Sequence, residues 1–205
     1  KGVVIKYNNI NEINVSYINT VNEDLYDLYG FKKENLIKTI EPDIEELFCV
    51  LFEKINNLNA PYNKIVTDII HENLIFLKKI PSLTLPYNES GGWLLEVLSI
   101  LKINSSIFSL YRELNEDLII SGIILKKIGL VSYFNDDFVF SVKNDVKNIN
   151  INLLSINNIN KYFNKNENYI KTNLQKIIIN KSEDTDIHVR YVNALYQFNR
   201  KISIC

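Results

Sequence analysis

Two neighbouring segments of this chain, residues 91–111 and 115–129, are apolar around most of the circumference that each would have as a helix. A helix of that kind has no face suited to water, so other elements must cover it on every side. Glycines stand at the start of the first segment, Gly91-Gly92, and inside the second, at Gly122. Glycine lets neighbouring backbones approach closely. The sequence therefore predicts a helical domain built around these two central helices.

Length and composition fit such a domain. Of the 205 residues, 46% are hydrophobic and 23% are charged, which is typical of a globular protein with a sizeable core. The 23 basic and 24 acidic residues nearly balance, so no overall positive field for nucleic-acid binding is expected, although a local basic groove remains open. Charged residues such as Glu96, Lys102 and Lys126 interrupt the apolar runs, which predicts no membrane span. The chain begins at Lys1 and contains no methionine, so we expect further sequence upstream.

The two cysteines, Cys49 and Cys205, are far apart in the sequence and form neither a disulfide framework nor a zinc-ligand cluster. This usage favours a reducing, cytoplasmic compartment. Cys49 lies beside the apolar stripe of a predicted helix and has no histidine near it in the sequence. It is therefore expected to be a buried, inert thiol.

Short β-branched runs at 3–7 and 13–18, separated by an asparagine-rich turn, predict an N-terminal β-hairpin. A second, small hairpin is predicted from 131–134 and 138–142, which flank Asn135-Asp136-Asp137. Outside the two central segments, helical spacing of apolar residues and helix-start signals predict helices at about 41–58, 61–79, 153–163, 169–179 and 186–203. The apolar stripe of the last helix comprises Val189, Val192, Leu195, Phe198 and Ile202.

Three motifs follow one another along the central segments: Gly91-Gly92-Trp93-Leu94-Leu95-Glu96, then Arg112-Glu113-Leu114-Asn115-Glu116-Asp117-Leu118, then the run from Leu118 to Gly129. Their order and spacing resemble an HD-superfamily domain, as found in bacterial 3′–5′ exoribonucleases that carry an oligonucleotide-binding β-barrel before the HD domain. The resemblance implies a mainly α-helical, HD-domain-like bundle at 41–205. It also implies that the hairpin at 1–20 is a remnant of the OB-type barrel and that 21–40 is a connector.

The residues that bind metal in that family are replaced in this chain. An HD phosphohydrolase needs histidine and carboxylate ligands from several helices, because its divalent metal must polarise the phosphate and activate water. Lys126-Lys127 stand in place of the His-Asp pair, and Ile177 to Ser182 replaces a histidine-rich segment. The resemblance places five residues at former metal-site positions: Glu96, Lys126, Lys127, Tyr196 and Asn199.

The two histidines of the chain, His71 and His188, fall outside these positions and are expected on helix flanks or at the surface. Glu96 is the available counter-charge for the two lysines. We therefore expect Lys126 or Lys127 to pair with Glu96, or to extend its charged end to the surface.

The sequence thus favours a catalytically inactive HD-like domain without metal or cofactor. It would act as a binding or scaffold module for a protein partner or larger assembly that the resemblance relates to RNA, away from membranes. RNA contacts, if made, would use lysines and arginines such as Lys126, Lys127, Lys181 and Arg200, which are otherwise solvated charges. Alternatives remain open: a metal-dependent phosphohydrolase or 3′–5′ exoribonuclease with unorthodox ligands, a purely structural subunit, or an unrelated helical bundle.

Overall fold

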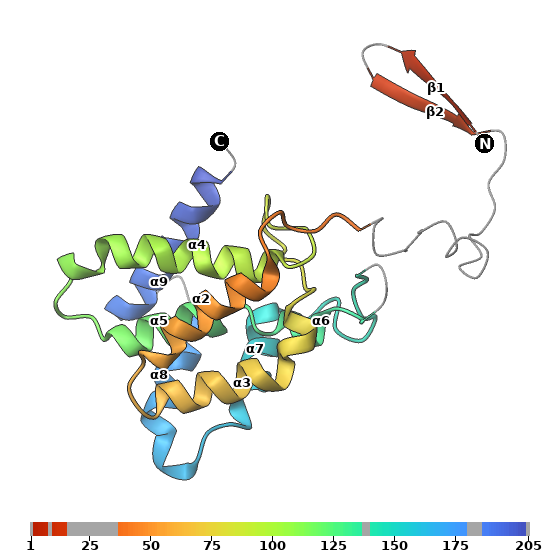
Figure 1. Ribbon diagram of the computed structural model, residues 1–205. Helices are drawn as coiled ribbons and strands as arrows, with labels where there is room; N and C mark the ends of the chain where they lie inside the picture. The colour runs from red at the N-terminus through yellow and green to blue at the C-terminus, as the bar shows by residue number, and fades with distance from the viewer. Residues whose placement is uncertain (1, 8–9, 16–36, 137–139, 180–185, 204–205) are drawn as a thin grey trace. The chain divides into compact units, whose positions relative to one another are not determined.

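The computed structural model describes residues 2–7, 10–15, 37–136, 140–179 and 186–203. The chain divides into two compact units, residues 1–37 and 38–205. In the first unit, strands β1 (Gly2–Tyr7) and β2 (Ile10–Val15) pair antiparallel, with Gly2 opposite Val15 and Tyr7 opposite Ile10 (Figure 1). β2 begins at Ile10, earlier than the expected strand start at Ile13. Most of the expected connector at 21–40 lies outside the described residues.

The second unit is mainly α-helical, as the sequence predicts. Four of its helices begin at an Asp or Asn whose side-chain oxygen accepts a hydrogen bond from a backbone N–H of the first turn. These caps are Asp43, Asn115, Asn150 and Asp186. The helices are α2 Ile44–Asn56, α3 Tyr62–Leu77, α4 Gly92–Ile107, α5 Glu116–Leu125, α6 Leu130–Tyr133, α7 Ile151–Asn160, α8 Asn168–Ile179 and α9 Ile187–Ile202, with 3-10 turns η3 Phe108–Leu110 and η4 Lys165–Glu167.

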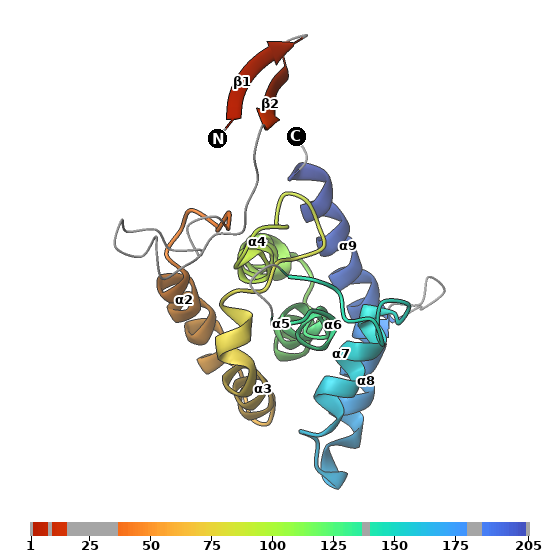
Figure 2. The same ribbon diagram turned by 90° about the vertical axis from the view of Figure 1, so that its right-hand side faces the viewer.

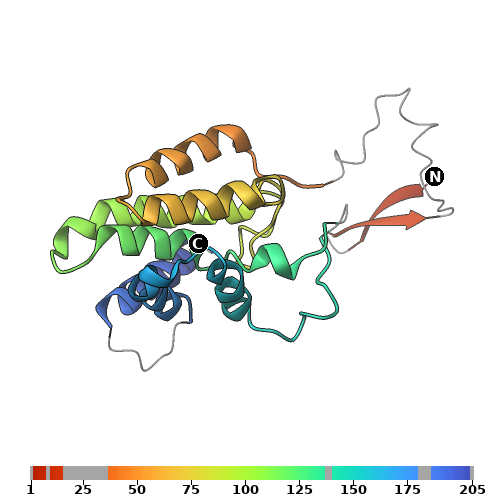
Figure 3. The same ribbon diagram turned by 90° about the horizontal axis from the view of Figure 1, so that it is seen from below.

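Helix α5 lies at the centre of this unit, in contact with α3, α4, α8 and α9. Figure 2 shows α5 nearly end-on, with α2 and α3 on one side and α7, α8 and α9 on the other. From below, α2, α3, α4 and α5 run side by side (Figure 3). Ile119, Ile123 and Ile124 of α5 are completely buried, as is Trp93 of α4. The two segments predicted to be central therefore form the core, although α5 ends at Leu125, before Gly129.

The start of α4 depends on its two glycines. Gly91 has a φ of +82°, a left-handed conformation that side chains other than glycine rarely adopt. A Cβ on Gly92 would lie 1.9 Å from the carbonyl oxygen of Tyr87, so only glycine fits there. The N–H groups of Gly91 and Trp93 donate to the carbonyls of Lys79 and Ile80, 3.0 and 3.2 Å away. These contacts fix the loop between α3 and α4 against the first turn of α4.

The expected internal hairpin is wrong in its first half. Residues 130–133 form helix α6, whose backbone N–H groups bond back to preceding carbonyls, as from Phe134 to Leu130 at 3.2 Å. An isolated antiparallel bridge joins Phe134 to Val142, and residues 137–139 lie outside the described part. A short apolar run is compatible with a strand or with a buried helical turn. Here the run is helical, and α6 contacts α3 and α7.

The expected burial of Cys49 is also wrong. Cys49 is exposed on α2, because it lies one position beyond the buried Phe48 and faces away from the core. In the apolar stripe of α9, Val189, Val192 and Leu195 are buried, whereas Phe198 and Ile202 are 54% and 49% exposed. The helical stretch Gly92–Leu110 is long and apolar enough to cross a membrane by length and composition alone. In this structure it packs against α2, α5 and α9.

The central position of α5 leads to a stability prediction. Changing Ile124 to Ala should lower the free energy of unfolding by about 2–5 kcal/mol, because a buried side chain is lost and a cavity remains. The matched control is Ile75→Ala, at a site that is 77% exposed, where little change is expected. Chemical denaturation of the three proteins measures the effect; equal stabilities would contradict the central role of α5.

Candidate functional site

An ion pair between a buried carboxylate and a partly buried lysine joins α4 to the turn that follows α5. Glu96 is only 2% exposed, and its two carboxylate oxygens lie 2.7 and 2.8 Å from the Nζ of Lys127. The hydroxyl of Ser82 donates a further hydrogen bond to the same carboxylate. The expectation that one of the two lysines pairs with Glu96 is confirmed, and the partner is Lys127.

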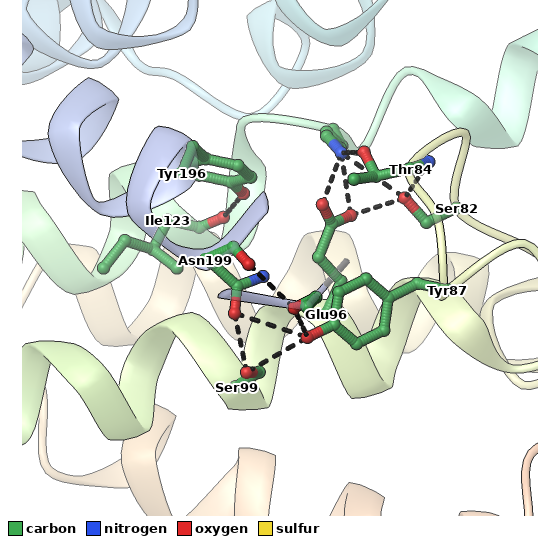
Figure 4. A network of polar contacts seen from close by, with 10 residues as sticks. Ser82, Thr84, Tyr87, Glu96, Ser99, Ile123, Tyr196 and Asn199 are labelled. Atoms are coloured by element: carbon green, nitrogen blue, oxygen red, sulfur yellow. Dashed lines mark hydrogen bonds and ion pairs between the residues drawn. The ribbon is translucent and has the colours of Figure 1, made fainter. Parts of the chain in front are cut away.

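The ammonium group of Lys127 is bound by the protein on several sides. It donates to the hydroxyl of Thr84 at 2.7 Å and to that of Ser82 at 3.3 Å, in addition to Glu96 (Figure 4). Ser82 and Thr84 belong to the proline-containing loop between α3 and α4, outside the residues that the sequence predicted for a site. The loop therefore supplies hydrogen-bond partners that compensate the burial of the charged pair.

Lys126 takes a different place. Its side chain is buried, and its Nζ donates to the carbonyl of Ile177 at 2.8 Å and to the side-chain oxygen of Asn193 at 3.0 Å. Ile177 lies in the last turn of α8, where carbonyls lack a partner within the helix. Burial, with a smaller contribution from the neighbouring Lys127, lowers the pKa of Lys126 to about 8. Lys126 thus joins α8 and α9 to the end of α5.

Tyr196 of α9 lies beside both lysines. The Nζ atoms of Lys126 and Lys127 are 5.7 and 5.5 Å from the centre of its ring, a distance at which cations are attracted to aromatic faces. Its hydroxyl donates to the carbonyl of Ile123 at 2.8 Å. Burial, with a smaller contribution from the negative charge of Glu96, raises the pKa of Tyr196 well above its ordinary value. The phenol therefore stays protonated and serves as a hydrogen-bond donor.

Asn199, one turn further along α9, forms a second group of contacts with α4. Its side-chain oxygen accepts hydrogen bonds from Ser99 at 2.8 Å and from the hydroxyl of Tyr87 at 3.3 Å (Figure 4). Tyr87 also lies 3.0 Å from the hydroxyl of Ser203. The side-chain nitrogen of Asn199 is buried and has no hydrogen-bond partner within the described part of the chain. These contacts hold the end of α9 against the first half of α4.

Of the five positions that the resemblance assigns to a metal site, four are linked by these contacts and Asn199 lies one turn further along α9. We call the five together the lysine cluster: Glu96, Lys126, Lys127, Tyr196 and Asn199. Within residues 37–136, 140–179 and 186–203, no three His, Cys, Asp or Glu side chains lie together in a way that could hold a metal ion. Chemically, the lysine cluster is a network of hydrogen-bonded charges, in which the side-chain nitrogen of Asn199 has no partner among the described residues.

The other residues proposed for phosphate contact are not all part of this cluster. Arg200 is exposed in the last turn of α9, and Lys181 lies outside the described residues. A phosphate approaching Lys127 would have to compete with Glu96, whose carboxylate already binds the ammonium group of Lys127.

The two histidines have the positions expected of them, at the surface and on a helix flank. His71 is exposed on α3 and stacks on Phe52, with ring centres 4.9 Å apart. His188 accepts a hydrogen bond from the backbone N–H of Asn115 at 3.2 Å, and its other ring nitrogen lies 3.0 Å from Asp186. These bonds connect the first turns of α5 and α9, which is a structural role.

Comparison with known proteins finds no match to a protein-family model, to a curated protein or to a solved structure.

The ion pair leads to a second prediction. Changing Lys127 to Met should destabilise the protein by about 3–5 kcal/mol, because Glu96 stays buried without its charged partner. The double variant Lys127→Met, Glu96→Leu removes both charges together and should recover most of this loss. Urea denaturation of the parent, both single variants and the double variant gives the coupling energy. Equal losses in the single and double variants would show that Glu96 does not depend on Lys127.

The depressed pKa of Lys126 leads to a third prediction. The folded state binds this proton less tightly than the unfolded state, whose lysine has its ordinary pKa of 10.5. The resulting penalty is fully present below pH 8 and disappears as the pH rises from about 8 toward 10.5. From about pH 7 to pH 10, the stability of the parent should therefore rise by roughly 2 kcal/mol relative to that of Lys126→Met.

This comparison is made by denaturation at both pH values, with Lys64→Met as the control for loss of an exposed lysine. The difference in unfolding free energy between the parent and Lys64→Met should not rise in the same way between pH 7 and pH 10. A difference in unfolding free energy between the parent and Lys126→Met that is the same at both pH values would contradict the burial of a charged Lys126.

Proposed function

We propose that residues 41–205 form a degenerate, HD-like domain that binds other macromolecules and has no catalytic activity. In this proposal it is a scaffold or binding module of a cytoplasmic assembly, related to RNA as the resemblance implies, with a protein as its main partner. The hairpin at the N-terminal end would be the remnant of an OB-type barrel.

The observation that supports the proposal is the convergence of the lysine cluster. Its members come from α4, from the turn after α5 and from α9, and the resemblance aligns each of them with a metal-site position of the superfamily. An unrelated bundle has no reason to gather these positions at one point of its interior. A metal site that has lost its ligands would still bring these positions together, because the helices that once carried converging ligands keep their packing.

The chemistry of the cluster supports an inactive domain. Glu96 is the carboxylate that a metal would use, and both of its oxygens already bind the ammonium of Lys127. A divalent cation would have to displace that ammonium and would also meet the charge of Lys126. The ion pair and its hydrogen bonds thus replace the electrostatic role that a metal ion has in an active member of the superfamily.

A hydrolysis assay tests this fourth prediction. The purified chain, incubated with labelled single-stranded RNA and with bis(p-nitrophenyl) phosphate, should show no manganese-dependent hydrolysis above a protein-free blank. Its melting temperature should be the same in chelator and in manganese, because no metal binding is coupled to folding.

The matched variant for this assay is Glu96→Gln, which removes the carboxylate charge. Any manganese-dependent hydrolysis that disappears in this variant would overturn the proposal and identify a phosphohydrolase with unorthodox ligands. A large loss of thermal stability in chelator would overturn it as well.

A further inference from the structure

One side of helix α2 carries an apolar surface apart from the lysine cluster. The helix packs against α3 and α4, and it lies at the edge of the row of helices in Figure 3. Val50, on the other side of α2, is apolar and yet 44% exposed. Beside it, a hollow of about 400 Å³ lies between α2 and α4. The apolar side chains that line this hollow are Leu47 and Val50 of α2 and Leu98 and Leu101 of α4.

Two opposite charges lie in line with Val50 on α2. Glu46 precedes Val50 by about one turn and Lys54 follows it by about one turn, so the three side chains form a row along the helix. Glu46 and Lys54 are about 12 Å apart along the helix axis, too far to pair with each other. Within the described part of the chain, neither forms an ion pair, whereas the neighbouring Glu45 pairs with Lys78 of α3.

The other charges near this row also have both signs. Glu41 and Asp43, just before α2, are exposed and add negative charge at the Glu46 end. Glu53 of α2 and Lys102 of α4 are exposed as well, and Lys102 lines the hollow together with Lys54. The surface is therefore neither uniformly acidic nor uniformly basic.

This charge pattern selects the kind of partner. A nucleic acid or an acidic peptide would be attracted to the two lysines but repelled by Glu46 and Glu53, and a basic peptide would meet the reverse problem. The complementary surface has an apolar centre, an acid at one end and a base at the other. The row on α2 has this pattern itself, so it is complementary to its own copy in the opposite direction.

We propose that a second copy of this chain packs on this surface, with the two α2 helices antiparallel about a twofold axis beside Val50. In such a contact the same patch serves on both copies, so each interaction occurs twice. Glu46 of each copy pairs with Lys54 of the other, and the two Val50 side chains meet between these ion pairs. The inference goes beyond the proposed function and uses no residue of the lysine cluster.

The dimer should be weak and dependent on concentration. Helix α2 has 13 residues and is therefore about 20 Å long. A contact of this length, with part of α4 beside it, belongs to the small interfaces that form reversible complexes. Analytical ultracentrifugation of the whole chain, from about 1 to about 300 μM, measures the dissociation constant. A reducing agent is present throughout, because Cys49 is exposed next to Val50.

Charge reversals give the decisive comparison. Glu46→Lys and Lys54→Glu should each weaken dimerisation at least about tenfold, because symmetry turns two attractive contacts into two repulsive ones. An equimolar mixture of the two variants should dimerise again, because a copy with two acids in the row then meets a copy with two lysines. The double variant Glu46→Lys, Lys54→Glu should also dimerise, since both ion pairs return with their signs exchanged.

The matched controls are Lys64→Glu and Asp68→Lys, at exposed positions one turn apart on α3. Dimerisation should be unchanged in each control and in their mixture. Thermal melting checks that every variant remains folded.

Several outcomes would overturn the inference. These are a parent that stays monomeric over the whole range, a dimer that is insensitive to both reversals, and a mixture that associates no better than the separate variants. A monomeric parent that binds single-stranded RNA, with binding lost in Lys54→Glu, would also overturn it by assigning the surface to another occupant. None of these outcomes bears on hydrolysis, so they are distinct from failure of the proposed inactive domain.

Discussion

The need to bury α5 on all sides governs the helical unit. Its residues are apolar nearly all round, and α3, α4, α8 and α9 each cover part of it. The covering helices can approach closely where a side chain is missing. A Cβ on Gly122 would lie 2.8 Å from a methyl carbon of Ile177 on α8. The stretch Gly92–Leu110, which is long and apolar enough to span a membrane, contains α4, and α4 packs against α5 in this bundle.

Two lysines directly after such a helix create a problem, because buried charges are costly unless they are paired and hydrogen-bonded. The two lysines have different hydrogen-bond partners. Lys127 faces α4 and is neutralised by Glu96, whereas Lys126 faces α8 and α9 and donates to neutral oxygens. Both lie at the C-terminal end of α5, where the helix dipole favours positive charge. Lys126 has no carboxylate partner among these contacts, and burial lowers its pKa. Lys127, by contrast, forms an ion pair with Glu96.

The lysine cluster fastens the first half of α4 to α5 and α9. In the proposed HD-like domain, a former metal site would have become an internal support of the bundle. Both Lys126 and Lys127 already donate to acceptors within the protein.

The sequence by itself determined what depends on local pattern. It indicated the helix starts at Asp43 and Asp186, the central segments and the pairing of Glu96 with a lysine, because caps, periodicity and charge balance act over few residues. Tertiary structure alone decided which lysine pairs with Glu96 and which one caps α8, since neighbouring residues on a turn point to different helices. It also placed Ser82 and Thr84 at the ion pair, made residues 130–133 a helix and left Cys49 and Phe198 exposed. Such outcomes depend on which element packs against each residue, and that information is distributed over the whole chain.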